Sequence, residues 1–197
     1  MLGYLWQWIF IVFFCLGFLI RLYFISQEHA LRFQRRTSDR GLIIISFIGM
    51  IFMPAVYLLT PWLDGIDYPL SNTASAIGVP LALLYLWLLL RSNLDQNGAF
   101  ATLQGNRESG EQKASGIYRV IRHPEYAAYM AWGAAQAFFL HNWAAGLSML
   151  AAIFILYAVR IPREERRMLA AFGEKYQKYI DETGRLLPRL FRRRAAD

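Results

Sequence analysis

The motif Arg122-His123-Pro124 stands directly before an apolar run and groups residue types that bind anions. Proline is favoured at the first position of a helix, so we expect a helix to begin at His123 and Pro124. The free N–H groups of a helix N-terminus, with their partial positive charge, attract a carboxylate or a phosphate. Arg122 adds a bidentate donor beside them. A simpler explanation is a basic anchor at a membrane interface with a capping histidine.

Two adjacent carboxylates, Glu164 and Glu165, follow a later apolar run and Pro162. Acidic residues in the first turn of a helix complement its dipole, which is a sufficient structural reason for a pair of glutamates. The functional alternative is that one of the two carboxylates binds a cation.

A tight hairpin is expected to bring these two groups together. The apolar runs 126–140 and 143–159 are separated only by His141 and Asn142. The far ends of two such short helices must be close in space, so Arg122 and its neighbours would face the two glutamates. One site would then offer receptors for an anion and a cation side by side, which suits a zwitterion such as an amino acid moiety.

The spacing of these residues resembles the isoprenylcysteine carboxyl methyltransferase family, and the phospholipid N-methyltransferases are similar over the same region. The resemblance covers roughly residues 116–188 and implies an integral membrane enzyme that uses S-adenosylmethionine. It implies a cofactor at the cytosolic ends of the last membrane hairpin, enclosed by the following tail. The matching residues are Gly116, Tyr118, Arg122, His123, Pro124 and Tyr126, followed by Glu164, Glu165, Leu169, Phe172, Gly173, Tyr176, Tyr179, Arg185 and Pro188.

S-adenosylmethionine carries a carboxylate, an ammonium and a sulfonium, and these residues offer a partner for each group. Arg122 and the helix N-terminus suit the carboxylate, and Glu164 or Glu165 suits the ammonium. An aromatic ring from one of three tyrosines could face the sulfonium or stack on the adenine. We therefore predict a cofactor site formed by Tyr118, His123, Pro124, Tyr126, Glu164, Glu165 and Tyr176.

We predict Arg122, His123 and Glu165 as the catalytic residues. Methyl transfer is an in-line displacement at carbon, which needs alignment and desolvation more than acid–base groups. A carboxylate acceptor needs no general base, and Arg122 or His123 could orient it. An amine acceptor needs a base such as a glutamate to take its proton. We favour carboxyl O-methylation of a lipophilic or lipidated substrate that enters from the bilayer.

Two other functions fit parts of the sequence. Sterol reductases that use NADPH share a related C-terminal architecture, but they tend to carry Asn at the position of Pro124, and they are longer. A non-catalytic membrane protein, such as a small transporter or an assembly factor, is the other alternative. Transport pathways usually carry intramembrane ionisable groups, and the apolar runs hold almost none. A Rossmann-type cofactor site is excluded because the chain has no strand–GxGxxG–helix unit.

All 21 Lys and Arg residues lie in three segments, 21–40, 91–122 and 160–194, with apolar sequence between them. Cytoplasmic loops of membrane proteins retain Lys and Arg, so this distribution predicts a multi-pass membrane protein with its chemistry on that side. The basic residues flank apolar spans, so the net charge of +7 indicates membrane lipids and not nucleic acid as the partner. The single cysteine, Cys15, lies in an apolar run, and we expect neither a disulfide nor a metal site.

Five apolar runs are predicted to cross the membrane, since a bilayer core takes roughly 20 residues of helix. Pro54 is expected to kink the second run, which is tolerable if neighbouring groups satisfy the freed carbonyl. Parity places all three basic segments on one side, with the N-terminus outside and the C-terminus in the cytoplasm. We expect an all-α polytopic fold of about five transmembrane helices. The runs are 4–25, 41–62, 74–90, 126–140 and 143–159.

The remaining segments complete a single domain of three N-terminal spans (1–91), a cytoplasmic loop (92–115), and a cofactor-binding hairpin and tail (116–188). The loop begins near Asn93, which is expected either to cap a helix or to approach the cofactor. Residues 61–73 carry two aspartates and no basic residue, which indicates an external loop.

We make one further prediction for the C-terminal tail and one for the tip of the hairpin. Residues 164–184 show helical spacing of apolar side chains, which predicts an amphipathic cytoplasmic helix against the membrane surface or the base of the bundle. His141, at the external tip of the hairpin, is expected to be a solvated turn residue.

Overall fold

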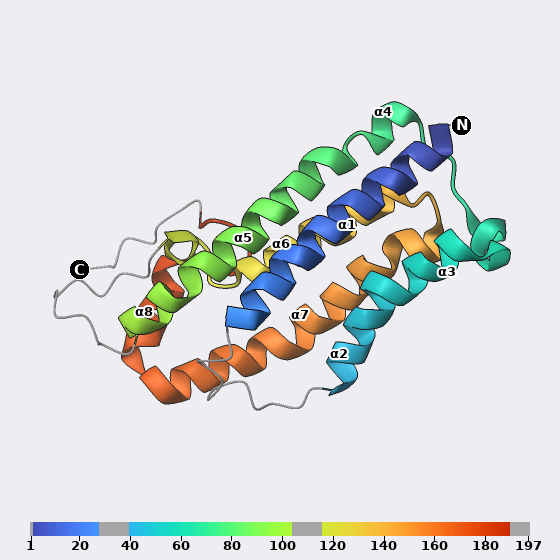
Figure 1. Cartoon of the computed structure of the whole chain (residues 1–197). Coiled ribbons are helices and arrows are strands. Elements are labelled where there is room, and N and C mark those ends of the chain that lie inside the picture. Colours follow the sequence, from blue (N-terminus) through green and yellow to red (C-terminus); the bar gives the residue numbers. More distant parts are fainter. Residues whose placement is uncertain (1, 28–39, 104–115, 190–197) are drawn as a thin grey trace.

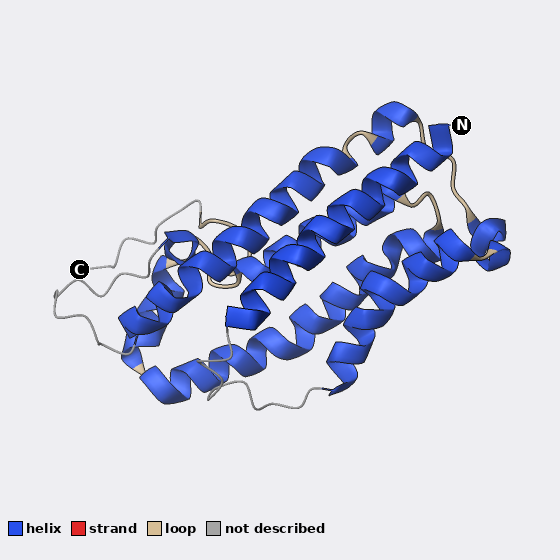
Figure 2. Ribbon diagram, viewed as in Figure 1, coloured by secondary structure: helices blue, strands red, loops and turns tan. Residues whose placement is uncertain are grey.

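The computed structural model describes residues 2–27, 40–103 and 116–189, and every regular element within those ranges is helical (Figures 1 and 2). This confirms the predicted all-α fold. In chain order the elements are α1 (Leu2–Gln27), α2 (Arg40–Phe47), the π-helix η2 (Ile48–Phe52), α3 (Met53–Leu59), the 3₁₀-helix η3 (Pro61–Ile66), α4 (Asn72–Ser75), α5 (Gly78–Leu103), the 3₁₀-helix η4 (Gly116–Arg119), α6 (Pro124–Phe139), α7 (Trp143–Phe172) and α8 (Glu174–Glu182).

Four stretches are long and apolar enough to cross a membrane, which agrees with a polytopic membrane protein. Many large apolar side chains on these helices point outward, as contact with lipid requires. The predicted fourth span, α6, has 16 residues and is therefore about 24 Å long, shorter than a typical bilayer core. None of its residues is exposed, so α6 is an interior helix. The four longer stretches are Tyr4–Ile25, Gly41–Leu59, Asn72–Gln96 and Trp143–Phe172.

Close packing of α6 against α5 and α7 forms the centre of the bundle, and α1 packs against α5 and α6 (Figure 1). A Cβ added at Gly133 would lie 2.9 Å from the backbone nitrogen of Leu150, so only glycine allows this approach of α6 to α7. Trp132 is completely buried, with ring centroids 5.2 Å from Phe10 and 5.0 Å from Tyr85. Such packing drives helix association in lipid, where the hydrophobic effect between helices is absent.

The two ends of the bundle differ in charge. The basic end carries Arg122 and Arg160 near α6 and α7, and the acidic end carries Asp67 between η3 and α4. The tip of the α6–α7 hairpin reaches the acidic end, where Asn142 Nδ2 donates to Asp67 Oδ1 at 2.8 Å. Helix ends therefore alternate between the two ends of the bundle along the chain, as the predicted parity requires.

His141 is not the solvated turn residue that the sequence predicted. It is half-buried, and its Nε2 lies 2.7 Å from Ser75 Oγ and 3.1 Å from the carbonyl oxygen of Phe138. The turn between α6 and α7 packs against α4, and this contact buries part of the imidazole.

Pro54 distorts its helix as predicted, and the distortion is a π-helical turn. In a π-helix each carbonyl accepts a hydrogen bond from the residue five positions later. Five positions after Gly49 comes Pro54, which has no N–H to donate. The Gly49 carbonyl instead accepts hydrogen bonds from Gln136 Nε2 at 3.2 Å and from Ser148 Oγ at 2.8 Å. Side chains of α6 and α7 thus satisfy the carbonyl that proline frees, which confirms the expectation.

Two helices extend further than the sequence predicted. The predicted loop 92–115 begins instead as part of α5, which continues to Leu103, and residues 104–115 lie outside the described residues. The helix α7 passes through Pro162 without a break. The predicted amphipathic helix is divided at Gly173, whose φ of +52° favours glycine and starts α8 in a new direction.

Replacing Gln136 by Leu would keep the volume of the side chain and remove its donors to two backbone carbonyls, Gly49 and Ala145. We expect a lower midpoint of thermal unfolding in detergent, equivalent to about 1–3 kcal/mol, because buried carbonyls lose donors. Ser148→Ala is the matched control, since it removes one donor to Gly49 and should cost less. An unchanged midpoint in Gln136→Leu would contradict this role.

Candidate active site

The end of α5 positions the segment that precedes α6. Asp95 Oδ2 accepts a hydrogen bond from the backbone N–H of Ile117 at 2.8 Å and pairs with Arg91 at 3.0 Å. Gly116 has a φ of +56°, and a Cβ there would overlap the Asp95 carboxylate. Glycine therefore allows η4 to begin in direct contact with α5.

The tail after α8 pairs with the segment before α6. The backbone N–H of Arg122 donates to the carbonyl of Gly184 at 2.8 Å, and that of His123 donates to the carbonyl of Arg185 at 3.0 Å. Gly184 donates in return to the carbonyl of Val120 at 3.1 Å. This short parallel pairing holds the tail beside the N-terminus of α6.

Glu165 on α7 is a buried carboxylate bound by two guanidinium groups. Its Oε1 accepts from Arg122 Nε and Arg185 Nε, each at 3.2 Å, and its Oε2 accepts from Arg185 Nη2 at 2.5 Å. Arg122 also donates through Nη1 to the carbonyls of Ile180, at 2.9 Å, and Thr183. Buried charges need this degree of pairing to offset their lost hydration. One carboxylate thus joins α7, the segment before α6 and the tail.

The imidazole of His123 lies between the two glutamates, as the hairpin predicted. Its Nε2 is 3.4 Å from Glu165 Oε1, and its Nδ1 is 3.9 Å from Glu164 Oε2. The ring meets that of Tyr126 edge to face, with centroids 5.7 Å apart. Nε2 is buried and makes no hydrogen bond with any described residue. Its contact with the Glu165 carboxylate is therefore electrostatic and falls short of a hydrogen bond.

Glu164 differs from its neighbour in exposure and in bonding. Its side chain is 33% exposed, against 8% for Glu165. Its Oε1 accepts from Arg160 Nε at 2.9 Å and from the Tyr126 hydroxyl at 3.2 Å. Among the described residues, its Oε2 has the longer approach to His123, at 3.9 Å, and accepts no hydrogen bond. Glu164 is therefore the carboxylate with an oxygen left for another cation, a distinction that the sequence did not make.

The N-terminus of α6 has the form that the sequence predicted. His123 is the residue before the first turn, and Pro124 is the buried first residue of the helix. The His123 side chain makes no capping hydrogen bond, so the N–H groups of the first turn are left without a side-chain cap. Their partial positive charge points toward the same end of the bundle as the glutamates.

The three predicted tyrosines occupy different surroundings. Tyr126 bonds Glu164, as described above. Tyr176 on α8 is buried, and burial together with the nearby Glu165 charge raises its pKa to about 12, so its hydroxyl is neutral at physiological pH. The Tyr118 hydroxyl donates to the Ser92 carbonyl on α5 at 3.3 Å.

Two arginines at the site were not assigned a role from the sequence. Arg185 binds Glu165, and Arg160 binds Glu164. Arg185 belongs to the motif that carries the family resemblance, and that motif could have identified it as a site residue. Asn93 does not cap a helix, because α5 continues past it. Its Oδ1 accepts from Arg21 on α1 at 3.4 Å.

Comparison with protein families finds a match over the hairpin and the helix before it. Residues 81–170 match the family model described as the isoprenylcysteine carboxyl methyltransferase (ICMT) family. A similar protein is Protein-S-isoprenylcysteine O-methyltransferase B of Arabidopsis thaliana, 30% identical over 64 residues. That match covers 32% of this chain and 32% of the plant protein, so the chain spans about a third of such a relative. These matches confirm the resemblance.

Bacterial relatives match a longer part of the chain. Methanethiol S-methyltransferase 2 of Bradyrhizobium diazoefficiens is 34% identical over 101 residues, which are 50% of this chain and 38% of that protein. Methanethiol S-methyltransferase of a Pseudomonas species is 26% identical over 174 residues, which are 81% of this chain and 63% of that protein. The similarity to the Pseudomonas protein therefore extends beyond the hairpin into the N-terminal helices.

Replacing Glu165 by Gln would leave two buried guanidinium groups without their counter-charge. We expect a loss of stability on the order of 3 kcal/mol, since removing one partner of a buried ion pair leaves an uncompensated charge. Glu164→Gln is the matched control, with a smaller expected loss because the side chain is partly exposed. Thermal unfolding of both variants in the same detergent checks this, and equal midpoints would contradict the central position of Glu165.

Proposed function

We propose that the chain is an integral membrane methyltransferase that uses S-adenosylmethionine. The acceptor is a lipophilic or lipidated substrate at the cytoplasmic face, with the basic end of the bundle on that side, the N-terminus outside and the C-terminus in the cytoplasm. The distribution of Lys and Arg supports this orientation. The named relatives are methyltransferases, which favours methyl transfer over nicotinamide-dependent reduction.

The observation that carries the proposal is the position of the His123 imidazole between two carboxylates and beside the uncapped start of α6. A zwitterion needs an anion receptor and a cation receptor a few ångströms apart. The first turn of α6 and Arg122 suit a carboxylate, and the open oxygen of Glu164 suits an ammonium. The amino acid part of S-adenosylmethionine has both groups.

The residues have distinct roles in this proposal. The cofactor supplies a methyl group bound to a positively charged sulfur. Tyr126 and Tyr176 offer aromatic rings to that charge or to the adenine. Arg122, His123 and Glu165 are the proposed catalytic residues, with Glu165 fixing the Arg122 guanidinium and His123 facing the acceptor. The tail paired with the segment before α6 excludes water from the reacting groups.

We favour carboxyl O-methylation. A carboxylate is already a nucleophile at neutral pH, so this acceptor gives up no proton. Its negative charge also suits a basic end with several arginines. The plant relative is named an O-methyltransferase, and the matching family model is described as a carboxyl methyltransferase family.

Thiol S-methylation is a second candidate, favoured by one observation. The match that covers 81% of this chain is to a methanethiol S-methyltransferase. A thiol acceptor must lose its proton, and the His123 imidazole, which faces two carboxylates, is the proposed group that accepts it. The two candidates share the cofactor site and differ in the acceptor.

Binding of S-adenosylhomocysteine tests the cofactor site. Calorimetric titration of the purified protein in detergent should show binding, and Glu164→Gln should weaken it by about tenfold or more through loss of a charge-assisted hydrogen bond. Glu174→Gln, an exposed change on α8, is the control and should bind like the parent. A folded parent protein that binds no S-adenosylhomocysteine would remove the proposal.

The chemical nature of the product separates the two acceptors. The protein is incubated with methyl-labelled cofactor and either a prenylated cysteine with a free carboxylate or a small alkanethiol. A methyl ester releases its label as methanol in alkali, whereas a thioether keeps it. We expect alkali-labile label from the prenylated cysteine. Label found only as thioether would replace O-methylation with S-methylation while leaving the cofactor site intact.

A further inference from the structure

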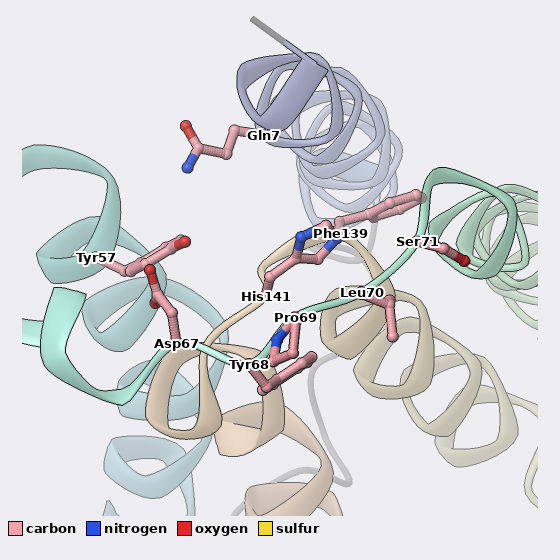
Figure 3. A pocket seen from close by; sticks show the side chains of 9 residues that line it. All are labelled: Gln7, Tyr57, Asp67, Tyr68, Pro69, Leu70, Ser71, Phe139 and His141. Atoms are coloured by element: carbon pink, nitrogen blue, oxygen red, sulfur yellow. The ribbon is translucent and has the colours of Figure 1, made fainter.

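A cavity of about 540 Å³ opens at the acidic end of the bundle, at the opposite end from the glutamate site (Figure 3). Its volume is in the range of small-molecule sites, roughly 300–1,000 Å³. Helices α1, α3 and α6 each contribute a wall, and the segment between η3 and α4 closes it. The lining residues are Gln7, Tyr57, Asp67, Tyr68, Pro69, Leu70, Ser71, Phe139 and His141.

The carboxylate of Asp67 is held in a defined position at this cavity. Asn142 is completely buried, and its Nδ2 donates to Asp67 Oδ1 at 2.8 Å and to the Leu63 carbonyl at 2.7 Å. The amide oxygen of Asn142 accepts from the first N–H groups of α7, so this side chain is fully bonded and rigid. The second oxygen of Asp67 accepts no hydrogen bond from the part of the chain that the structure describes. It is therefore free for a ligand.

The chain supplies no Lys or Arg to balance this charge. No Lys or Arg lies between residues 41 and 90 or between residues 123 and 159, the segments that form the acidic end. A carboxylate with no Lys or Arg beside it in the described residues, next to low-dielectric walls, attracts positive charge.

Aromatic groups line the same cavity as the carboxylate. Tyr57, Tyr68, Phe139 and His141 contribute rings to the cavity (Figure 3). The Tyr68 hydroxyl donates to the Ala137 carbonyl, which fixes the ring in place. Aromatic rings beside one carboxylate form the usual receptor for an alkylammonium group. A divalent metal is disfavoured, because it needs several oxygen ligands and the described residues hold no group of three ligating side chains.

Two exposed tryptophans belong to the same end of the bundle as the cavity. Trp62 and Trp143 belong to the same end and are 80% and 59% exposed. Tryptophan at the surface of a membrane protein marks the interface between lipid and water. A ligand at this depth can come from the bilayer or from water.

We propose that this cavity binds an alkylammonium group, with Asp67 as its counter-ion and the tyrosine rings as its walls. Phosphatidylethanolamine headgroups and free amines share this chemistry. The proposal is independent of methyl transfer, because the cavity lies at the other end of the bundle and shares no residue with the glutamate site.

Native mass spectrometry of the full chain in a non-ionic maltoside tests the proposal. Phosphatidylethanolamine is added, phosphatidylglycerol serves as the anionic comparison, and ethanolamine is added as the free amine. We expect phosphatidylethanolamine to bind more tightly than phosphatidylglycerol, and Asp67→Asn to weaken binding by about tenfold. Asn accepts the same hydrogen bond from Asn142, so the fold should survive. Asp64→Asn is the matched control, since Asp64 does not line the cavity.

The outcomes distinguish a free amine from a lipid headgroup and include results that would overturn the proposal. Competition by ethanolamine supports a receptor for the free group, whereas binding of the lipid alone supports a headgroup site. Tyr57→Leu keeps an apolar wall without the ring and should weaken binding several-fold. Equal binding of both lipids, or unchanged binding in a folded Asp67→Asn variant, would overturn the proposal.

Discussion

The basic end of the bundle depends on one buried carboxylate. Glu165 binds a guanidinium from before α6 and another from beyond α8, so three parts of the chain meet at a single group. A buried charge costs several kcal/mol unless it is paired, which makes the three parts mutually dependent. Arg122 also bonds carbonyls of the tail, and the tail is held further by its backbone pairing with the segment before α6. The position of His123 at the start of α6 follows from this arrangement.

The hydrocarbon core of the bilayer imposes a second constraint, because backbone carbonyls within it need hydrogen-bond donors from the protein. A proline within a membrane helix frees a carbonyl that water cannot reach. Here α6 and α7 provide the donors, and these are the helices that carry the site at the opposite end of the bundle. The packing of the second span on the hairpin is therefore fixed by polar bonds as well as by shape. The same hairpin positions Asn142 and His141 at its tip.

The sequence predicted what local rules determine. Pro124 starts α6, the two-residue connection forms the hairpin, and Pro54 distorts its helix. Continuation of α7 through Pro162 and its end at Gly173 depend instead on tertiary contacts that periodicity does not contain. Adjacent residues on a helix point about 100° apart, so Glu165 faces the interior while Glu164 stays at the edge. Their different roles become visible only once the tail is placed.

Contacts between distant segments also explain why the sequence did not predict the surroundings of Arg185 and His141. Arg185 is separated from Glu165 by a turn and a helix, and no spacing rule connects them. The half-buried environment of His141 arises from α4, which packs on it from a distant part of the sequence. Such contacts between segments far apart in the chain are the part of a fold that a single sequence does not reveal.

The shortness of α6 also sets the depth of its first turn. Both neighbours, α5 and α7, continue past the level at which α6 begins, so that turn is recessed below their ends. With the basic end at the membrane surface, as proposed, such a recess would lie near the boundary between headgroups and acyl chains. For any amphiphile that reaches it sideways, the concentration that governs encounter is its mole fraction in the membrane. Dilution by other lipids, and not by the surrounding water, would then control how often the recess is filled.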